Sequence, residues 1–546
     1  MKKTLKRVVA LIMALAMVLT TCVAAAAADP EDVTPVIYIH GLNGADVMNN
    51  LGTDDETAMF TDFDLDAALA KAEEFNSADS IKAVLNGEKS ISECNADIVI
   101  DVLACVLAAI PFNCDEDGEP LNGSGVETFD APLSDEQCDD YTDTSLLSFQ
   151  WFGEHAMACS IADEIGYDNV YAFMYDWRLD ACENAEKLRD FVKMVKEQTG
   201  SDKVTLAGDS EAGIVMSAYL DKYGRKDDLD RLVFVNAAFA GVSMTGLYNE
   251  DMVGSDVALK TYIAELGECV LGQPYSDITE YLAMGLSLPL DAVADILQMV
   301  ADSDELTERL YLEVLKPFFG NCPAFYEFIP YAQFDDAMEK MTDMGFLSKD
   351  SGVYAKLQKY HKVQGRLTKN LQQAEKDGID VAIIANYGTP SIPITSDYVN
   401  QTDGLIDTKY ASAGATVADY GSTLDAEGKY VSPDKTIDAS TCALPDSTWF
   451  VKDLMHCFVI QDQDLMDLFV ELVTGPTAAE VDDIYASTGY TQFLQMDNGI
   501  FNQTLTNIDE DTELDGWFGV EGETFFEVTF ISPIDGEVYT YRVDVA

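Results

Sequence analysis

Short apolar runs alternate with amphipathic stretches through much of the chain, and this alternation is the main indicator of its fold. The apolar runs have the length of buried strands and lie at residues 36–39, 170–177, 203–208, 232–236 and 381–388. Residues 183–198 and those that follow Glu211 have the hydrophobic period of helices. Strands and helices that alternate at this spacing predict an α/β fold, with a mainly parallel, doubly wound sheet covered by helices on both faces.

Two long segments interrupt this rhythm. Residues 45–150 lack it, and residues 241–376 contain amphipathic stretches that read as further helices. We expect both segments to be insertions that form a cap over the main body. The end of the chain alternates polar and apolar residues, which predicts a small antiparallel β appendage. The expected organisation is a signal peptide, an α/β domain and this appendage, at 1–28, 29–495 and 496–546.

The first 28 residues have the pattern of an export signal. A basic start is followed by an apolar run from Val8 to Leu19 and by small residues up to Ala28, which predicts cleavage after Ala28 and a secreted protein. The alternative is a lipoprotein anchored through Cys22, because the LTTC tetrad weakly matches a lipobox. No later apolar run approaches the roughly 20 residues of a spanning helix, so no transmembrane segment is expected in the mature chain.

The charge balance of this 546-residue chain argues against some classes of partner. Its 97 acidic and 33 basic residues give a formal net charge of −64, a field that repels nucleic acids and anionic membrane surfaces. We therefore expect a substrate that is neutral, zwitterionic or cationic overall. The four histidines are far apart and there is no C-x-x-C pair, so neither a metal nor a cofactor is expected. The pairing of the eleven cysteines and the oligomeric state stay open.

The stretch LAGDSEAGIV, residues 206–215, contains a candidate nucleophile. A catalytic serine of the G-x-S-x-G type sits on a sharp strand-to-helix turn, where small residues two positions before and after it let the turn close. Around Ser210 these places are filled by Gly208 and Ala212, with Gly213 next. The alternative is that Asp209 or Ser210 merely caps the helix that follows.

A serine nucleophile needs a histidine base and an acid that orients the histidine. Asp403 lies in the turn TDG after a predicted strand, and His456 lies in DLMHC just ahead of a predicted helix. The chain order Ser210, Asp403, His456 is the order typical of α/β hydrolases. Asp407 is the second candidate for the acid.

The oxyanion that forms in acyl transfer needs N–H donors that are already in place. One candidate is the backbone amide of Glu211, which directly follows the serine at a helix N-terminus. The other is the amide of Leu42 in HGLNG, the loop after the first apolar run. HGLNG could equally be a plain glycine turn.

Several motifs together resemble those of α/β hydrolases of the lipase type, specifically the lecithin:cholesterol acyltransferase and phospholipase group. These motifs are IHGLNG, MYDWRLD, the serine turn, VFVNAAFAGVS, CPAFYEFIP, and TDG followed by a histidine, and they span roughly residues 33–475. The resemblance implies an α/β-hydrolase fold, with Asp176 and Arg178 beside the active site or in a structural ion pair. Asp209 and Glu211 depart from the family, which usually has histidine before the serine and a hydrophobic residue after it.

These observations predict a secreted serine hydrolase that cleaves carboxylic esters of lipids through an acyl-enzyme intermediate. If an alcohol replaces water as acceptor, the enzyme is an O-acyltransferase, and the sequence does not separate the two outcomes. The first alternative is a catalytically inactive relative that acts as an extracellular binding protein, with the acidic turn as the mark of lost chemistry. The second is a peptidase on the same fold.

Overall fold

The computed structural model describes most of the chain. The described residues are 33–59, 65–86, 95–134, 137–138, 148–259, 261–262, 290–456, 463–476, 479–499, 502–508, 525–531 and 538–544. The expected export signal and Cys22 lie outside them.

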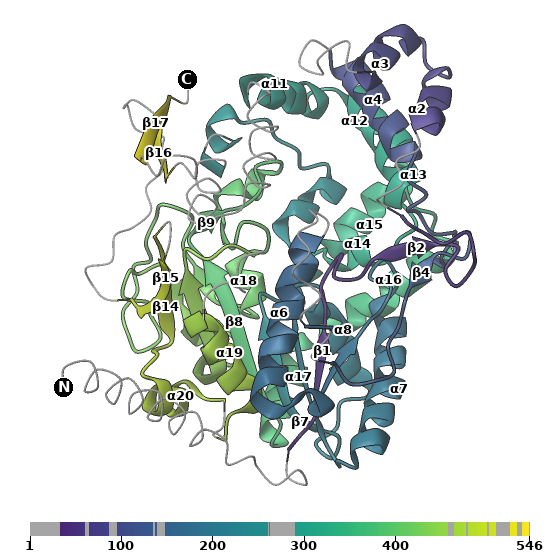
Figure 1. The fold of residues 1–546 in the computed structure, drawn as a ribbon. Helices are drawn as coiled ribbons and strands as arrows, with labels where there is room; N and C mark the ends of the chain where they lie inside the picture. The colour runs from purple at the N-terminus through teal and green to yellow at the C-terminus, as the bar shows by residue number, and fades with distance from the viewer. Residues whose placement is uncertain are drawn as a thin grey trace, which may run out of the picture.

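A large sheet forms the centre of the molecule (Figure 1). In chain order its strands are β1 (Val36–Ile39), β5 (Val170–Phe173), β6 (Val204–Asp209), β7 (Leu229–Val235), β8 (Asp380–Tyr387), β13 (Thr448–Lys452), β14 (Phe493–Gly499) and β15 (Asn502–Asn507). Across the sheet the order is β15-β14-β13-β8-β7-β6-β1-β5, and neighbours are parallel except β14 with β15. The predicted α/β fold with a mainly parallel sheet is therefore confirmed.

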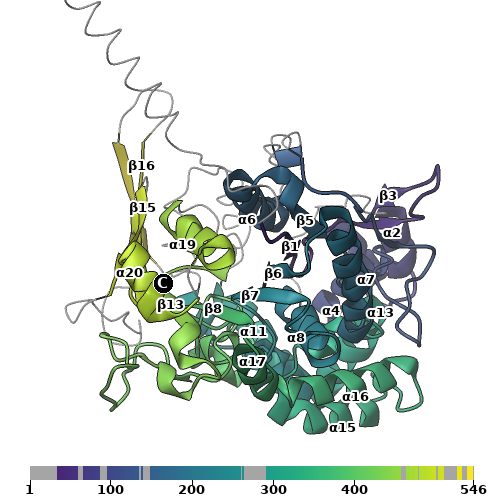
Figure 2. The same ribbon diagram turned by 90° about the horizontal axis from the view of Figure 1, so that it is seen from below.

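Helices cover both faces of this sheet, as Figure 2 shows. One face carries α6 (Ser148–Ile165) and α19 (Gln463–Thr474), and the other carries α7 (Ala181–Thr199), α8 (Ala212–Lys222), α16 (Gly352–Gln364) and α17 (Leu367–Lys376). Successive strand residues point to opposite faces, so Ile37 and Ile39 join one core while Val36 and Tyr38 join the other. Burial on both faces explains why β1 is a continuous apolar run and why much of β5, β6, β7 and β8 is apolar.

The two insertions meet in one cap, at the top of Figure 1. The first contains β2 (Val47–Asn49), β3 (Thr57–Ala58), β4 (Gly125–Val126), α2 (Leu65–Ala72), α3 (Ala78–Leu85) and α4 (Ala96–Ala108). The second contains η3 (Ser243–Asn249), α11 (Leu290–Ala301), α12 (Asp304–Arg309), η4 (Leu310–Leu315), α13 (Lys316–Phe319), α14 (Ala324–Glu327) and α15 (Phe334–Asp343). Ile100 and Ala104 of α4 share an apolar cluster with Val300 and Val314 of the second insertion.

The second insertion ends earlier than the expected boundary at residue 376. Leu367, Leu371 and Ala374 of α17 are buried in the sheet core together with Val381 of β8. This helix is therefore part of the layer over the sheet and not of the cap, and α16 packs beside it on α7 and α8. The helical period of α17 predicts an apolar face, but it does not show that this face packs on the sheet.

The C-terminal region also differs from the expected appendage. The boundary at 495/496 falls inside β14, which pairs with β13, and β15 extends the same sheet. The reason is packing, because Leu494 and Leu505 are buried in the main core and Phe493 stacks on Phe450. Of the described strands after residue 492, β16 (Phe525–Ile531) and β17 (Val538–Asp544) form a separate antiparallel pair.

The remaining short elements lie between the main strands and helices. They are β9 (Thr389–Pro390), β10 (Gln401–Thr402), α18 (Thr408–Ala411), β11 (Thr416–Val417), β12 (Ile437–Asp438) and α20 (Val481–Thr488). Cys138 and Cys159 form a disulfide. None of the helices in the described ranges is both long and apolar enough to cross a bilayer.

Candidate active site

Ser210 lies on a tight turn between β6 and α8. Its φ of 54° is in the left-handed region, which a residue with a side chain rarely adopts. A Cβ atom at Gly208 would lie 2.6 Å from the carbonyl oxygen of Ile39 and 2.7 Å from the Cβ of Ala212. A Cβ at Gly213 would lie 2.5 Å from the Cβ of Ala237. The small residues around Ser210 are therefore needed for the turn to close.

The three side chains expected to act together are within hydrogen-bond distance of one another. His456 Nε2 lies 3.0 Å from Ser210 Oγ, and His456 Nδ1 lies 2.7 Å from Asp403 Oδ2. An ionised carboxylate only accepts, so Nδ1 carries the proton that it donates to Asp403. Nε2 of a neutral ring is then free to accept the Ser210 hydroxyl proton.

The loop around Asp403 holds its carboxylate in place. Asp403 Oδ1 accepts hydrogen bonds from the backbone N–H groups of Leu405 and Ile406, at 3.0 and 2.7 Å. The backbone N–H of His456 in turn donates to the Asp403 carbonyl at 2.8 Å. The second candidate, Asp407, accepts from Ser243 instead, and the structure brings Asp403 rather than Asp407 to the histidine.

The surroundings of His456 favour its cation. Burial of the ring lowers its pKa, but the charge of Asp403, the hydrogen bond to it and the charge of Asp209 raise it, and the net pKa lies above the usual value. Asp209 Oδ1 accepts a hydrogen bond from the Tyr38 hydroxyl at 2.9 Å. The N-cap of α8 is Glu211, so Asp209 does not occupy the cap position, and its charge is held near the candidate base.

His40 organises the loop that contains Leu42. The backbone N–H of Tyr175 donates to His40 Nε2 at 3.2 Å, so His40 Nδ1 carries the proton and donates to the Gly41 carbonyl at 2.7 Å. Burial lowers the pKa of His40 to about 4, so the ring is neutral at neutral pH. The Leu42 N–H belongs to the same planar peptide as the Gly41 carbonyl and points the opposite way. His40 therefore fixes the direction of a candidate oxyanion donor.

Asp176 and Arg178 form a buried ion pair behind this loop. Arg178 Nε and Nη2 donate to the two oxygens of Asp176 at 2.9 and 2.7 Å. Arg178 Nη1 also donates to the Phe112 carbonyl at 2.9 Å, and Nη2 donates to Ser124 Oγ at 3.1 Å. These contacts support the structural interpretation, since the guanidinium ties the end of β5 to the first insertion.

Sequence reasoning missed part of this site. The roles of His40 and Tyr175 were not predicted, although HG directly after the first strand and Tyr in MYDWRLD were visible signals. The side chain of Glu211 was noted only as a departure from the family pattern, and its burial was not predicted. This side chain has an exposed fraction of 2%.

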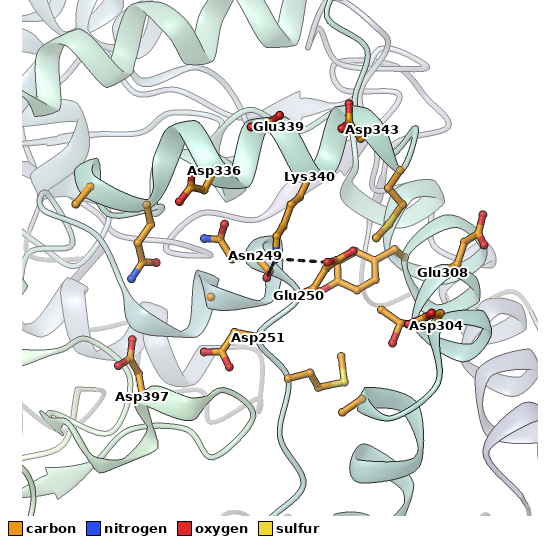
Figure 3. Close-up of a pocket in the computed structure, with 18 residues that line it drawn as sticks. Asn249, Glu250, Asp251, Asp304, Glu308, Asp336, Glu339, Lys340, Asp343 and Asp397 are labelled. Atoms are coloured by element: carbon orange, nitrogen blue, oxygen red, sulfur yellow. Dashed lines mark hydrogen bonds and ion pairs between the residues drawn. The ribbon is translucent and has the colours of Figure 1, made fainter.

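A pocket of about 1050 Å³ lies elsewhere, between η3, α12 and α15 (Figure 3). Lys340 points to the Asn249 carbonyl and to Glu250. The acidic residues in its wall are Glu250, Asp251, Asp304, Glu308, Asp336, Glu339, Asp343 and Asp397. Ser210, Asp403 and His456 do not line this pocket. The groups of the candidate site are therefore separate from this acidic hollow.

Comparisons with known proteins do not identify a family. No family model matches the chain, and no curated protein matches it. A solved structure that is similar in part is the crystal structure of the Tle4-Tli4 complex, at 14% identity and a TM-score of 0.20. The match covers 41% of this chain and 48% of the other, so it spans about half the length of that protein. A likeness of this size indicates neither a shared fold nor a shared function.

Proposed function

We propose that this protein is a secreted serine hydrolase of the α/β-hydrolase type that cleaves carboxylic esters through an acyl-enzyme intermediate. One observation carries the proposal: Ser210, His456 and Asp403 form an unbroken hydrogen-bonded series at the carboxyl edge of a parallel sheet. Parallel α/β sheets commonly bind their ligands at this edge.

The geometry suits a two-step acyl transfer. Ser210 Oγ attacks the ester carbonyl carbon while His456 Nε2 takes its proton, and the protonated ring then gives that proton to the departing alcohol. Asp403 stabilises the imidazolium that forms between these events. A water molecule, or an alcohol in an acyltransferase, then releases the acyl group from Ser210 by the same route.

The oxyanion of each tetrahedral intermediate would be held by the amides of Leu42 and Glu211. The Glu211 amide is at the N-terminus of α8, where backbone N–H groups lack partners within the helix. The Leu42 amide is aimed by the His40 contact with Gly41. Such donors are each worth roughly 3–4 kcal/mol of transition-state stabilisation in related chemistry.

Lipid esters are the proposed substrate class. The motifs within residues 33–475 that resemble the acyltransferase and phospholipase group support it. The net charge of −64 favours ester lipids that are neutral or zwitterionic over anionic ones.

A fluorophosphonate probe tests the nucleophile. We expect stoichiometric labelling of the folded protein that is lost in Ser210→Ala and strongly slowed in Asp403→Asn. The matched control is Ser217→Ala, because Ser217 is also buried on α8 and its hydroxyl donates to the Gly213 carbonyl of the same helix at 2.6 Å. Folded wild-type protein that takes no label would instead support a binding protein.

An ester series separates the remaining alternatives. We expect turnover of long-chain esters or phospholipids that disappears with Ser210→Ala, and acyl transfer to an added alcohol would show the acyltransferase outcome. Cleavage of peptides without cleavage of any ester would contradict the proposal and favour a peptidase.

A further inference from the structure

Glu211 combines two features that rarely occur together. Its backbone amide is a proposed oxyanion donor, and its side chain is buried in the protein with an exposed fraction of 2%. Glu211 Oε2 is buried and has no hydrogen-bond partner among the described residues. An ionised carboxylate in such a place would lose its hydration without compensation.

Among the described residues, the groups that shift the pKa of the Glu211 carboxyl do not include a cation. Asp176 adds a negative charge from the end of β5 and raises the pKa of Glu211 beyond the effect of burial. Glu327 of α14 and Tyr360 of α16 are also buried nearby, and the charge of Glu211 contributes to the raised pKa of each. The guanidinium of Arg178 pairs with Asp176.

We infer that Glu211 is a neutral carboxylic acid in the active protein, and that its ionisation at alkaline pH switches off the oxyanion hole. This inference rests on the proposed hydrolase function. Burial without a cation and the neighbouring carboxylate both favour the neutral form. Glu211 is thus a positioning residue, because its side chain acts on the oxyanion through the charge state of the site.

The consequence for catalysis follows from electrostatics. A neutral Glu211 leaves its own N–H and that of Leu42 as the groups that the oxyanion meets. A carboxylate on the same residue would repel the oxyanion in a region of low dielectric and would oppose the stabilisation that the donors provide. The acidic turn is therefore compatible with activity at neutral pH.

The first test compares pH profiles of kcat/KM for the wild type and Glu211→Gln, a neutral isostere, from about pH 5 to about pH 10. Each profile is normalised to its own value at neutral pH, so that the shapes of the two profiles are compared and not their absolute rates. Above the pKa of Glu211, kcat/KM of the wild type should fall by up to about tenfold for each pH unit relative to kcat/KM of Glu211→Gln. The control is Glu186→Gln, which removes a half-exposed carboxylate from α7.

One kinetic result would overturn the inference. If the two normalised profiles stayed parallel over the whole pH range, the switch would not exist. Glu211→Met, which is similar in length and uncharged, serves as a second variant if Glu211→Gln does not fold.

A second measurement does not depend on activity. The infrared difference spectrum of the wild type minus Glu211→Gln at neutral pH should contain a protonated-carboxyl C=O band that shifts in D₂O, because other buried acids contribute equally to both proteins. Identical spectra of the two proteins in that region would overturn the neutral acid even if the enzyme were active. Conversely, the band together with no fluorophosphonate labelling of Ser210 would reject the hydrolase function and leave the charge state of Glu211 intact.

Discussion

Ser210 has a backbone conformation that costs free energy, and its neighbours show what maintains it. Residues outside the favoured φ/ψ regions cost of order 1–3 kcal/mol and persist only where the surrounding structure enforces them. Here β6 and α8 enforce the turn. The Ser210 N–H donates to the carbonyl of Val235 at the end of β7, and the N–H of Ala238, just after β7, donates to the Ser210 carbonyl. The enforced turn therefore places Ser210 Oγ opposite His456.

Asp209 gives a prediction about the pH dependence of activity. His456 must be neutral to accept the serine proton, so kcat/KM should rise as pH passes its raised pKa. Asp209→Asn removes a negative charge that favours the cation, so the acid limb should move to lower pH. Tyr38→Phe is the control, because it deletes the hydrogen bond to Asp209 and keeps the charge. An acid limb that moves to higher pH in Asp209→Asn would contradict this account.

Among the strands and helices, the ion pair at the end of β5 joins the sheet to the cap. Arg178 is completely buried and Asp176 nearly so. Arg178→Met would remove the cation that pairs with the buried Asp176 carboxylate and leave it the backbone N–H of residue 178, which should lower the free energy of unfolding by about 3–5 kcal/mol. The double variant with Asp176→Asn should recover part of this loss. Urea denaturation measures both, and equal losses in the single and double variants would speak against a buried pair.

Two buried thiols, one from each insertion, lie close together. Cys114 of the first and Cys322 of the second have their Sγ atoms 3.7 Å apart. We expect an oxidised disulfide reagent to join them by thiol–disulfide exchange, with release of two reduced thiols from the reagent. Peptide mapping without reduction should then find this cross-link, while Cys442, which is also buried, stays free. Recovery of Cys114 and Cys322 as separate thiols after oxidation of the folded protein would refute the prediction.

Across the whole molecule, buried acids should make stability depend on pH. Burial is the largest cause of the raised pKa of Glu327, and the same holds for Asp180, Glu211 and Asp407. In the folded state such groups keep protons that the unfolded chain loses above its pKa of roughly 4 to 4.5. The unfolded state therefore binds fewer protons, so stability falls as pH rises from there through the folded pKa values.

Melting temperatures measured across pH test this dependence. We expect Tm to be highest in mildly acidic solution and to fall toward alkaline pH, and Glu327→Gln should flatten the fall. Added salt should raise Tm, because it screens repulsion within a chain of net charge −64. A Tm that rises steadily from acidic to alkaline pH would show that paired carboxylates, not buried neutral ones, dominate.

Much of the architecture was predictable because it is encoded locally. A buried parallel strand must be an apolar run, and β1, β6, β7 and β8 are such runs. A nucleophile turn must have small neighbours, which marks Ser210 from ten residues of sequence. The order of the catalytic candidates also follows from the order of the loops. Patterns of this kind depend on residues close together in the chain.

The tertiary structure alone decided which side chains meet and which carboxyls are buried. Asp403 and Asp407 stand in the same loop, yet Asp403 faces His456 and Asp407 bonds to Ser243. Glu211 reads as a surface acid at a helix start, yet it is enclosed by segments from distant parts of the chain. The same holds for α17 and β14, whose apolar faces belong to the main core. The physical reason is that burial and contact depend on packing between remote segments, which no local period or turn signal records.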